Sequence, residues 1–319
     1  MRKDSLGLSN SEMAAFRRCR RRWYLGHYRR MKPRVDPAAG TALSVGNFVH
    51  DALAAWYNTE NRIDPVEYAQ TALELAIAEH PSEETARRKE FTLVEAMLTG
   101  YMEWLEAEGA DADLTILGSE QTVKVPLRDS SGLIGITLLS KLDAPVERKS
   151  DGQRLALEHK TTGSLDAPQI GYRIDAQFLT EHLARFLHSI EQGMTPEEAH
   201  RDCSGILVNL LKKVKRSGTA KPPFYARVEV PHNIYELRNH WKHVVAIGRE
   251  IAATEARLDA GEDHHSVAPP TPIPDRCKWE CEFFRICPLF DDGSDAEGAL
   301  NAIYEERDPL ERYDGADEF

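Results

Sequence analysis

Residues 155–163 read Leu-Ala-Leu-Glu-His-Lys-Thr-Thr-Gly, and residues 138–145 before them read Leu-Leu-Ser-Lys-Leu-Asp-Ala-Pro. Both runs are short and apolar and contain acidic residues at or near one end. The residues between them, 148–153, are turn formers. The pattern therefore predicts a hairpin of two strands, and this hairpin is the point from which we interpret the rest of the chain.

Side chains on a strand alternate between two faces, which puts Glu158 and Lys160 on one face and His159 on the other. Asp143 reaches the same corner from the neighbouring strand. Two carboxylates within about 4 Å repel by roughly 4 kcal/mol at an effective dielectric near 20, so the corner requires a cation or a proton. Magnesium or manganese prefers such oxygen ligands and, beside a lysine, favours phosphodiester hydrolysis. The alternative is an ordinary ion pair of Glu158 with Lys160.

Asp143 with Glu158-His-Lys160 resembles the core motif of the PD-(D/E)XK nuclease superfamily. The chain is most similar to its RecB-like branch, which includes CRISPR-associated RecB-like and phage exonucleases. Further matches follow in the family's order over about residues 8–290. They are the Gly46-x-x-x-His50 motif, Gln177 on a later helix, Cys19 near the N-terminus, and Cys277, Cys281 and Cys287 near the C-terminus.

The resemblance implies an α/β, restriction-endonuclease-like core with a mixed sheet, helical additions and a C-terminal cysteine cluster. It also implies a metal-dependent DNA exonuclease. His50, Asp143, Glu158 and the main-chain carbonyl of His159 would hold Mg²⁺ or Mn²⁺. Lys160 would orient the attacking water or help to deprotonate it.

Gln177 would bind a phosphate or nucleobase in this comparison. The family usually has a tyrosine four residues later, where this chain has Glu181. A different class of protein, a non-catalytic DNA-binding module that keeps the nuclease fold as a scaffold, is the alternative. The complete set of motif residues argues against it.

Three cysteines near the C-terminus have x3 and x5 spacing, and a proline directly follows the last: Cys277, Cys281 and Cys287. This spacing is typical of metal-binding thiolates. The resemblance adds Cys19 as the fourth ligand and implies a structural [4Fe-4S] cluster. Structural Zn²⁺ is the alternative, because four cysteines also suit zinc and histidines lie nearby at 264–265.

The 319 residues are 41% apolar and carry a net charge of −12, so composition alone does not indicate a nucleic-acid partner. Basic residues nevertheless concentrate at 17–34 and 212–221, and we expect Arg21, Arg22 and Lys213 to contact DNA. There is no apolar run long enough to cross a membrane and no signal-peptide core, so we expect a cytoplasmic protein.

We expect one RecB-like nuclease domain over 1–290, with a helical insertion at about 60–110 and a cluster-binding segment at 275–290. Residues 291–319 are rich in acids and are expected to form a mobile tail. No Gly-x-x-x-x-Gly-Lys-Ser/Thr motif occurs, so a built-in ATP-driven helicase is not expected. Partners in recombination, repair or CRISPR adaptation fit the resemblance.

Periodicity predicts the remaining elements. The expected helices cover residues 44–57, 65–80, 82–109, 175–187 and 234–260, and another starts near Ser11. Strands are expected at 115–126 and 133–143, which with 153–160 would form a three-stranded antiparallel meander. Two more, at 205–211 and 224–230, flank the basic loop.

Overall fold

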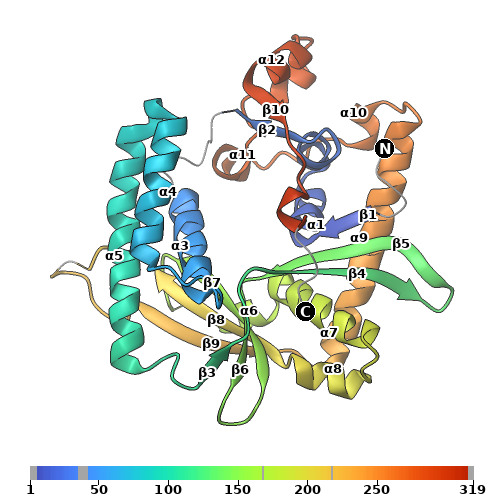
Figure 1. Cartoon of the computed structure of the whole chain (residues 1–319). Coiled ribbons are helices and arrows are strands. Elements are labelled where there is room, and N and C mark those ends of the chain that lie inside the picture. Colours follow the sequence, from blue (N-terminus) through green and yellow to red (C-terminus); the bar gives the residue numbers. More distant parts are fainter. Residues whose placement is uncertain (1–5, 35–41, 167–168, 217, 315–319) are drawn as a thin grey trace. The chain divides into compact units, whose positions relative to one another are not determined.

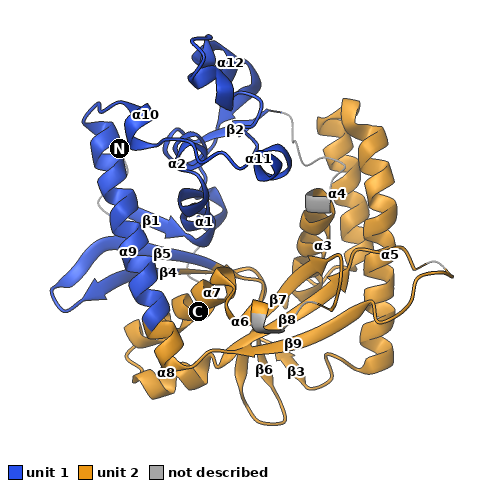
Figure 2. Cartoon of the chain, turned by 180° about the vertical axis from the view of Figure 1, so that it is seen from behind, with its two compact units in different colours: residues 1–37, 124–140, 239–316 blue, residues 38–123, 141–238, 317–319 orange. Residues whose placement is uncertain are grey.

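The computed structural model describes residues 6–34, 42–166, 169–216 and 218–314, which fall into two compact units (Figure 2). Unit 1 comprises residues 1–37, 124–140 and 239–316, and unit 2 comprises residues 38–123, 141–238 and 317–319. The domain expected over 1–290 therefore contributes segments to both units. Within the described ranges, no helix is both long and apolar enough to span a bilayer.

Unit 2 contains a mixed five-stranded sheet with the strand order β3-β6-β7-β8-β9. The strands are β3 (Leu114–Ile116), β6 (Ala144–Arg148), β7 (Arg154–Thr162), β8 (Gly205–Lys212) and β9 (Tyr225–Pro231). β7 and β8 are parallel, whereas the other neighbours are antiparallel. The mixed α/β fold predicted from the sequence is thus confirmed.

Three helices lie together on one side of this sheet: α3 (Ala42–Tyr57), α4 (Pro65–Glu79) and α5 (Glu84–Glu108) (Figure 1). Apolar residues of α3 and α5 form one buried cluster with Leu155 and Leu157 of β7. Gly46 allows α3 to lie close to this strand, because a Cβ there would be 3.2 Å from Thr161 Oγ1. A side chain at residue 46 would therefore crowd Thr161, and His50 lies one turn later on the same helix.

On the other side of the sheet lie α6 (Gln169–Arg173), α7 (Ala176–Glu191) and α8 (Pro196–Asp202) (Figure 2). α7 begins where the Asp175 side chain accepts a hydrogen bond from the backbone N–H of Gln177. Phe178 and Leu183 of α7 are buried. The start of α7 is thereby fixed against the sheet beside β7.

The predicted meander is wrong. β4 (Gln121–Asp129) and β5 (Gly132–Leu142) belong to a separate three-stranded sheet, in which β1 (Leu6–Ser9) pairs with β5 in parallel. The turn predicted at 148–153 is present, but the short strand β6 supplies the hairpin partner of β7. Because β6 and β8 occupy the two edges of β7, β5 cannot pair with β7.

Unit 1 combines both ends of the chain. The N-terminal elements are α1 (Asn10–Arg18), α2 (Arg20–Trp23), the π-helical η1 (Tyr24–Tyr28) and β2 (Met31–Pro33). The C-terminal elements are α9 (Ile234–Asp259, in unit 1 from residue 239), α10 (His264–Val267), α11 (Pro274–Glu280), η3 (Cys287–Phe290), α12 (Ala296–Ile303), β10 (Tyr304–Glu306) and η4 (Glu311–Tyr313). The first helix starts at Asn10, one residue before the predicted position, and its N-cap is Ser9.

The acidic segment after residue 290 is folded. β10 pairs with β2 in an antiparallel ladder, and Leu300 and Tyr304 are buried. The expectation of a mobile tail therefore does not describe residues 291–314, and residues 315–319 lie outside the described part of the chain.

Ion pairs between the two ends of the chain accompany this folding. Acids of the C-terminal region pair with the basic segment 17–34, in the combinations Arg18–Glu280, Arg20–Glu250, Arg21–Asp291, Arg22–Glu282, Arg29–Glu297, Arg30–Asp308 and Lys32–Glu305. Arg21 is the most buried of these arginines, and Asp291 binds its guanidinium with both carboxylate oxygens, at 2.6 and 2.9 Å. The two sequence blocks of opposite charge thus neutralise one another inside unit 1.

Asp291→Ala should lower the free energy of unfolding by about 2 kcal/mol, because it leaves the buried charge of Arg21 without its carboxylate. The value is below that of a fully buried pair, because the Asp291 side chain is 49% exposed. Asp308→Ala is the control: it removes the exposed partner of Arg30 and should cost less than about 1 kcal/mol. Urea unfolding measures both values, and equal losses would show that the burial of Arg21 adds nothing to its pairing with Asp291.

Candidate active site

β7 places the motif side chains on opposite faces of the sheet, as the alternation predicts. Glu158 and Lys160 lie on the α7 side, where the Lys160 Nζ is 4.6 Å from the centre of the Phe178 ring. His159 lies on the α3 side and stacks on Tyr57, with ring centres 5.1 Å apart. The strand therefore separates an ionic face from an aromatic one.

His50, Asp143 and Glu158 meet at one buried corner. The Nε2 of His50 lies 2.5 Å from Asp143 Oδ1, and the other Asp143 oxygen accepts the backbone N–H of His159 at 2.8 Å. Glu158 Oε1 accepts the backbone N–H of Asp143 at 3.1 Å. Asp143 is 6% exposed and Glu158 is 2% exposed. The structure thus brings together these three predicted residues from α3, from the residue before β6, and from β7.

The charged groups of this corner shift one another's pKa values. Burial opposes the charged form of His50, but the Asp143 carboxylate and its hydrogen bond raise the pKa of His50 to about 10. Burial would raise the pKa of Asp143, yet the positive charge of His50 holds it below its usual range. Burial raises the pKa of Glu158 well above its usual range, and the charges of Asp143 and Glu181 raise it further. The corner therefore favours protons on His50 and Glu158 over two bare carboxylates.

The donor types of this corner suit a hard divalent cation. The ligand atoms of His50, Asp143 and Glu158 do not all lie within 4.8 Å of one another, so a bound cation would draw them together. One imidazole nitrogen and two carboxylates are ligands that Mg²⁺ and Mn²⁺ accept, and a +2 charge can replace the protons that now compensate the acids. His50 is a ligand only when its Nε2 is unprotonated, so its ion pair with Asp143 must release a proton before a metal binds.

Lys160 is anchored at the start of α7. Its Nζ donates to Asp175 Oδ2 at 2.8 Å, and Asp175 is also the N-cap of that helix. The lysine side chain remains partly exposed. The capping residue of α7 therefore fixes the direction of the motif lysine.

Gln177 and Glu181 are linked on α7. Gln177 is exposed, and its Nε2 donates to Glu181 Oε1 at 2.9 Å. Glu181 is 5% exposed, and burial raises the pKa of its carboxyl well above its usual range, with the charge of Asp143 adding to the effect. The sequence showed Glu181 only as a departure from the family pattern. The signal for its position is the i, i+4 spacing from Gln177, which puts both residues on one helix face.

Glu120 is a further acid beside this corner. Its Oε1 lies 4.0 Å from His50 Nδ1, and its carboxylate pairs with Lys141. Its backbone has φ +54°, which is unusual for a residue other than glycine, and its N–H donates to the Asp143 carbonyl. Glu120 is thus a partly exposed acid beside the corner.

The three residues expected to contact DNA lie in different units of the chain. The guanidinium of Arg21 is held by Asp291 and that of Arg22 by Glu282, so both are engaged within unit 1 rather than presented to a phosphate. Lys213 follows β8 in unit 2, and its backbone N–H donates to the Thr162 carbonyl at the end of β7.

The four predicted cysteine ligands line one cavity of about 350 Å³ in unit 1: Cys19, Cys277, Cys281 and Cys287. Backbone N–H groups of Thr271 and Ile273 donate to the sulfur atoms of Cys19 and Cys277, each at 3.4 Å. His265, considered as a zinc ligand, is instead held by Asp263 and the Phe290 carbonyl. The cavity therefore fits a cofactor bound by thiolates.

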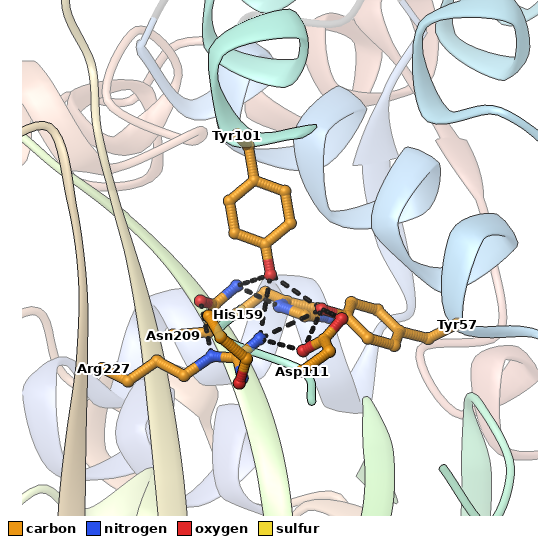
Figure 3. Close-up of polar contacts among 7 residues, drawn as sticks. Tyr57, Tyr101, Asp111, His159, Asn209 and Arg227 are labelled. Carbon is orange, nitrogen blue, oxygen red and sulfur yellow. Dashed lines mark hydrogen bonds and ion pairs between the residues drawn. The ribbon is translucent and has the colours of Figure 1, made fainter. Parts of the chain in front are cut away.

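On the α3 side of β7, His159 belongs to a polar network (Figure 3). Asn209 Nδ2 donates to His159 Nδ1 and to the Tyr101 hydroxyl, each at 2.9 Å. Arg227 joins the same network and pairs with Asp111 at 2.5 Å. Burial lowers the pKa of His159 to about 3, so this imidazole is neutral. The sequence pattern indicated no role for the side chain of His159, whereas the structure makes it part of the support of β7.

His159→Ala should lower the free energy of unfolding of metal-free protein by about 2–3 kcal/mol. The substitution removes the stacking on Tyr57 and leaves a buried Asn209 donor without its acceptor. Urea unfolding measures the loss, and the exposed His243→Ala is the control that should stay near the wild-type value. A His159→Ala protein as stable as wild type would show that the network does not support β7.

Comparison with known proteins supports the motif. The family model described as the PD-(D/E)XK nuclease superfamily matches residues 7–288, a span that contains all the residues of the corner. A search of curated proteins gives no match. Among solved structures, one described as "Crystal structure of SSO0001" is 16% identical, with 75% of this chain and 84% of that chain covered and a TM-score of 0.29. On the family match, the chain belongs to the PD-(D/E)XK nuclease superfamily.

Proposed function

We propose that this protein is a DNA exonuclease that depends on Mg²⁺ or Mn²⁺. One observation carries the proposal: His50, Asp143 and Glu158 converge in a buried corner, with Lys160 on the same strand face as Glu158. Superfamily membership supports nuclease chemistry at this corner.

When bound, the metal would supply positive charge to a phosphodiester and acidify a water molecule. His50, Asp143, Glu158 and the carbonyl of His159 would hold it. Metal binding would require His50 to lose the Nε2 proton that it now shares with Asp143, so that its ring nitrogen becomes available as a ligand.

Lys160 would orient the attacking water and help to remove its proton. Asp175 and the ring of Phe178 restrict the lysine to the start of α7, so that its ammonium stays on the Glu158 face of β7. This restriction lowers the entropy that the side chain loses when it aligns with a substrate.

The motif order supports the RecB-like branch, and with it a role in recombination, repair, phage DNA processing or CRISPR adaptation beside partner proteins. The basic loop that contains Lys213 is the best candidate for attracting DNA, because it follows the strand beside β7. The arginines at 17–34 contribute less, since acids of the same unit neutralise them.

We also propose that Cys19, Cys277, Cys281 and Cys287 bind a [4Fe-4S] cluster with a structural role. The cavity that they line, about 350 Å³, is much larger than a single ion requires. Zinc bonds of about 2.3 Å would draw four sulfurs to roughly 3.8 Å from one another. Among the described residues, no three of these sulfurs lie within 4.8 Å of one another, a spacing that suits a larger cluster better.

Asp143→Ala, Glu158→Ala and Lys160→Ala should each reduce metal-dependent cleavage by about a hundredfold or more, because they remove a metal ligand or the proton-transfer group. The assay uses end-labelled single- and double-stranded DNA with Mn²⁺, with and without chelator. Glu229→Ala, an exposed carboxylate on the same sheet, is the control that should keep wild-type activity.

A Lys160→Ala protein with the wild-type rate would contradict the mechanism. Release of internal fragments instead of terminal nucleotides would refute the exonuclease assignment. Wild-type protein that binds DNA in Mn²⁺ without cutting it would indicate a non-catalytic binding module.

Protein purified without oxygen should be brown and contain about four irons per chain. Serine at any of the four cavity cysteines should remove the colour. Cys203→Ser is the control and should keep it, because Cys203 is buried in unit 2 and does not line the cavity. A colourless protein with one zinc per chain would refute the iron–sulfur assignment.

A further inference from the structure

Glu181 has one carboxylate oxygen satisfied and one not. Its Oε1 accepts the Gln177 amide at 2.9 Å. Its Oε2 is buried and has no hydrogen-bond partner among the described residues. The side chain is 5% exposed, so water reaches it poorly. A buried carboxylate oxygen without a donor is unfavourable unless a proton or a cation compensates it.

Glu181 lies on α7, the helix that packs on the Glu158 face of β7. Two contacts join the start of this helix to that face: the Lys160 Nζ donates to Asp175 Oδ2 at 2.8 Å and lies 4.6 Å from the centre of the Phe178 ring. Glu181, Asp143 and Glu158 are all buried, and the imidazole of His50 pairs with Asp143.

The Gln177 side chain holds Glu181 in an orientation that suits a metal ligand. Gln177 lies one helical turn before Glu181, and its amide fixes one oxygen so that the other is left for another partner. An amide that orients a ligating carboxylate is a common feature of metal centres. The exposed Gln177 therefore positions Glu181 in this arrangement.

We propose that Glu181 is an additional ligand of the divalent metal centre, binding the cation through Oε2, with Gln177 as its positioning residue. The inference rests on the proposed metal-dependent function. It assigns a metal-binding role to the position where the resembling family has a tyrosine, and it gives Gln177 a role other than base or phosphate binding.

The test is Mn²⁺ binding to the full chain, measured by isothermal titration calorimetry, together with melting temperatures in the absence and presence of Mn²⁺. Glu181→Gln should raise the Kd for Mn²⁺ about tenfold or more. It should not lower the melting temperature of metal-free protein, because it removes an uncompensated buried carboxylate. The stabilisation produced by Mn²⁺ should shrink accordingly.

Two further variants make the result specific. Glu191→Gln removes an exposed carboxylate about 15 Å along the same helix and should bind Mn²⁺ like wild type. Gln177→Ala changes only an exposed side chain and should weaken Mn²⁺ binding several-fold. It keeps the test decisive if Glu181→Gln does not fold.

The outcomes separate the two proposals. If wild type binds no Mn²⁺, or Asp143→Ala binds it as wild type does, the proposed function fails. If Asp143→Ala abolishes binding while Glu181→Gln and Gln177→Ala keep the wild-type Kd, the role of Glu181 is overturned and a proton on its carboxylate is the explanation. An unchanged Kd with a lower metal-free melting temperature would show a purely structural role.

Discussion

The compensation of buried negative charge at the β7 corner is the constraint on which the rest of unit 2 depends. Asp143 and Glu158 share backbone and side-chain hydrogen bonds in a region with little access to water, so their charges must be balanced locally. His50 provides that balance from α3, and the small side of this helix at Gly46 lies against Thr161 of β7. The scaffold thus brings both acids and the balancing imidazole into one buried corner.

Paired charges also occur in unit 1, where they join the two ends of the chain. Acids beyond residue 249 neutralise the arginines of 17–34, and the β2–β10 ladder adds backbone hydrogen bonds. The cysteine cavity joins the same two segments, since Cys19 and Cys277 are 258 residues apart in sequence (277 − 19). A cluster bound there would close a long loop that ion pairs already bring together.

The sequence predicted those parts of the site that depend on local pattern. Strand alternation placed Glu158 and His159 on opposite faces, and helical periodicity located the helix that contains His50. The sequence pattern did not reveal β6, because five residues are too few for a clear pattern. The predicted partner of β7 was therefore wrong. The sequence pattern also could not foresee the pairing of Arg21 with Asp291 or the burial of Glu181, since both depend on tertiary contacts between distant segments.

Anomalous diffraction from crystals grown with Mn²⁺ tests the metal-binding role of the corner most directly, because it locates the metal without reference to activity. We expect a manganese peak at bonding distance, about 2–2.5 Å, from the His50 Nε2 and from carboxylate oxygens of Asp143 and Glu158. The ion pair between His50 and Asp143 should then be broken. A corner with that ion pair intact and no manganese peak, at a Mn²⁺ concentration that supports cleavage, would contradict the proposed metal site.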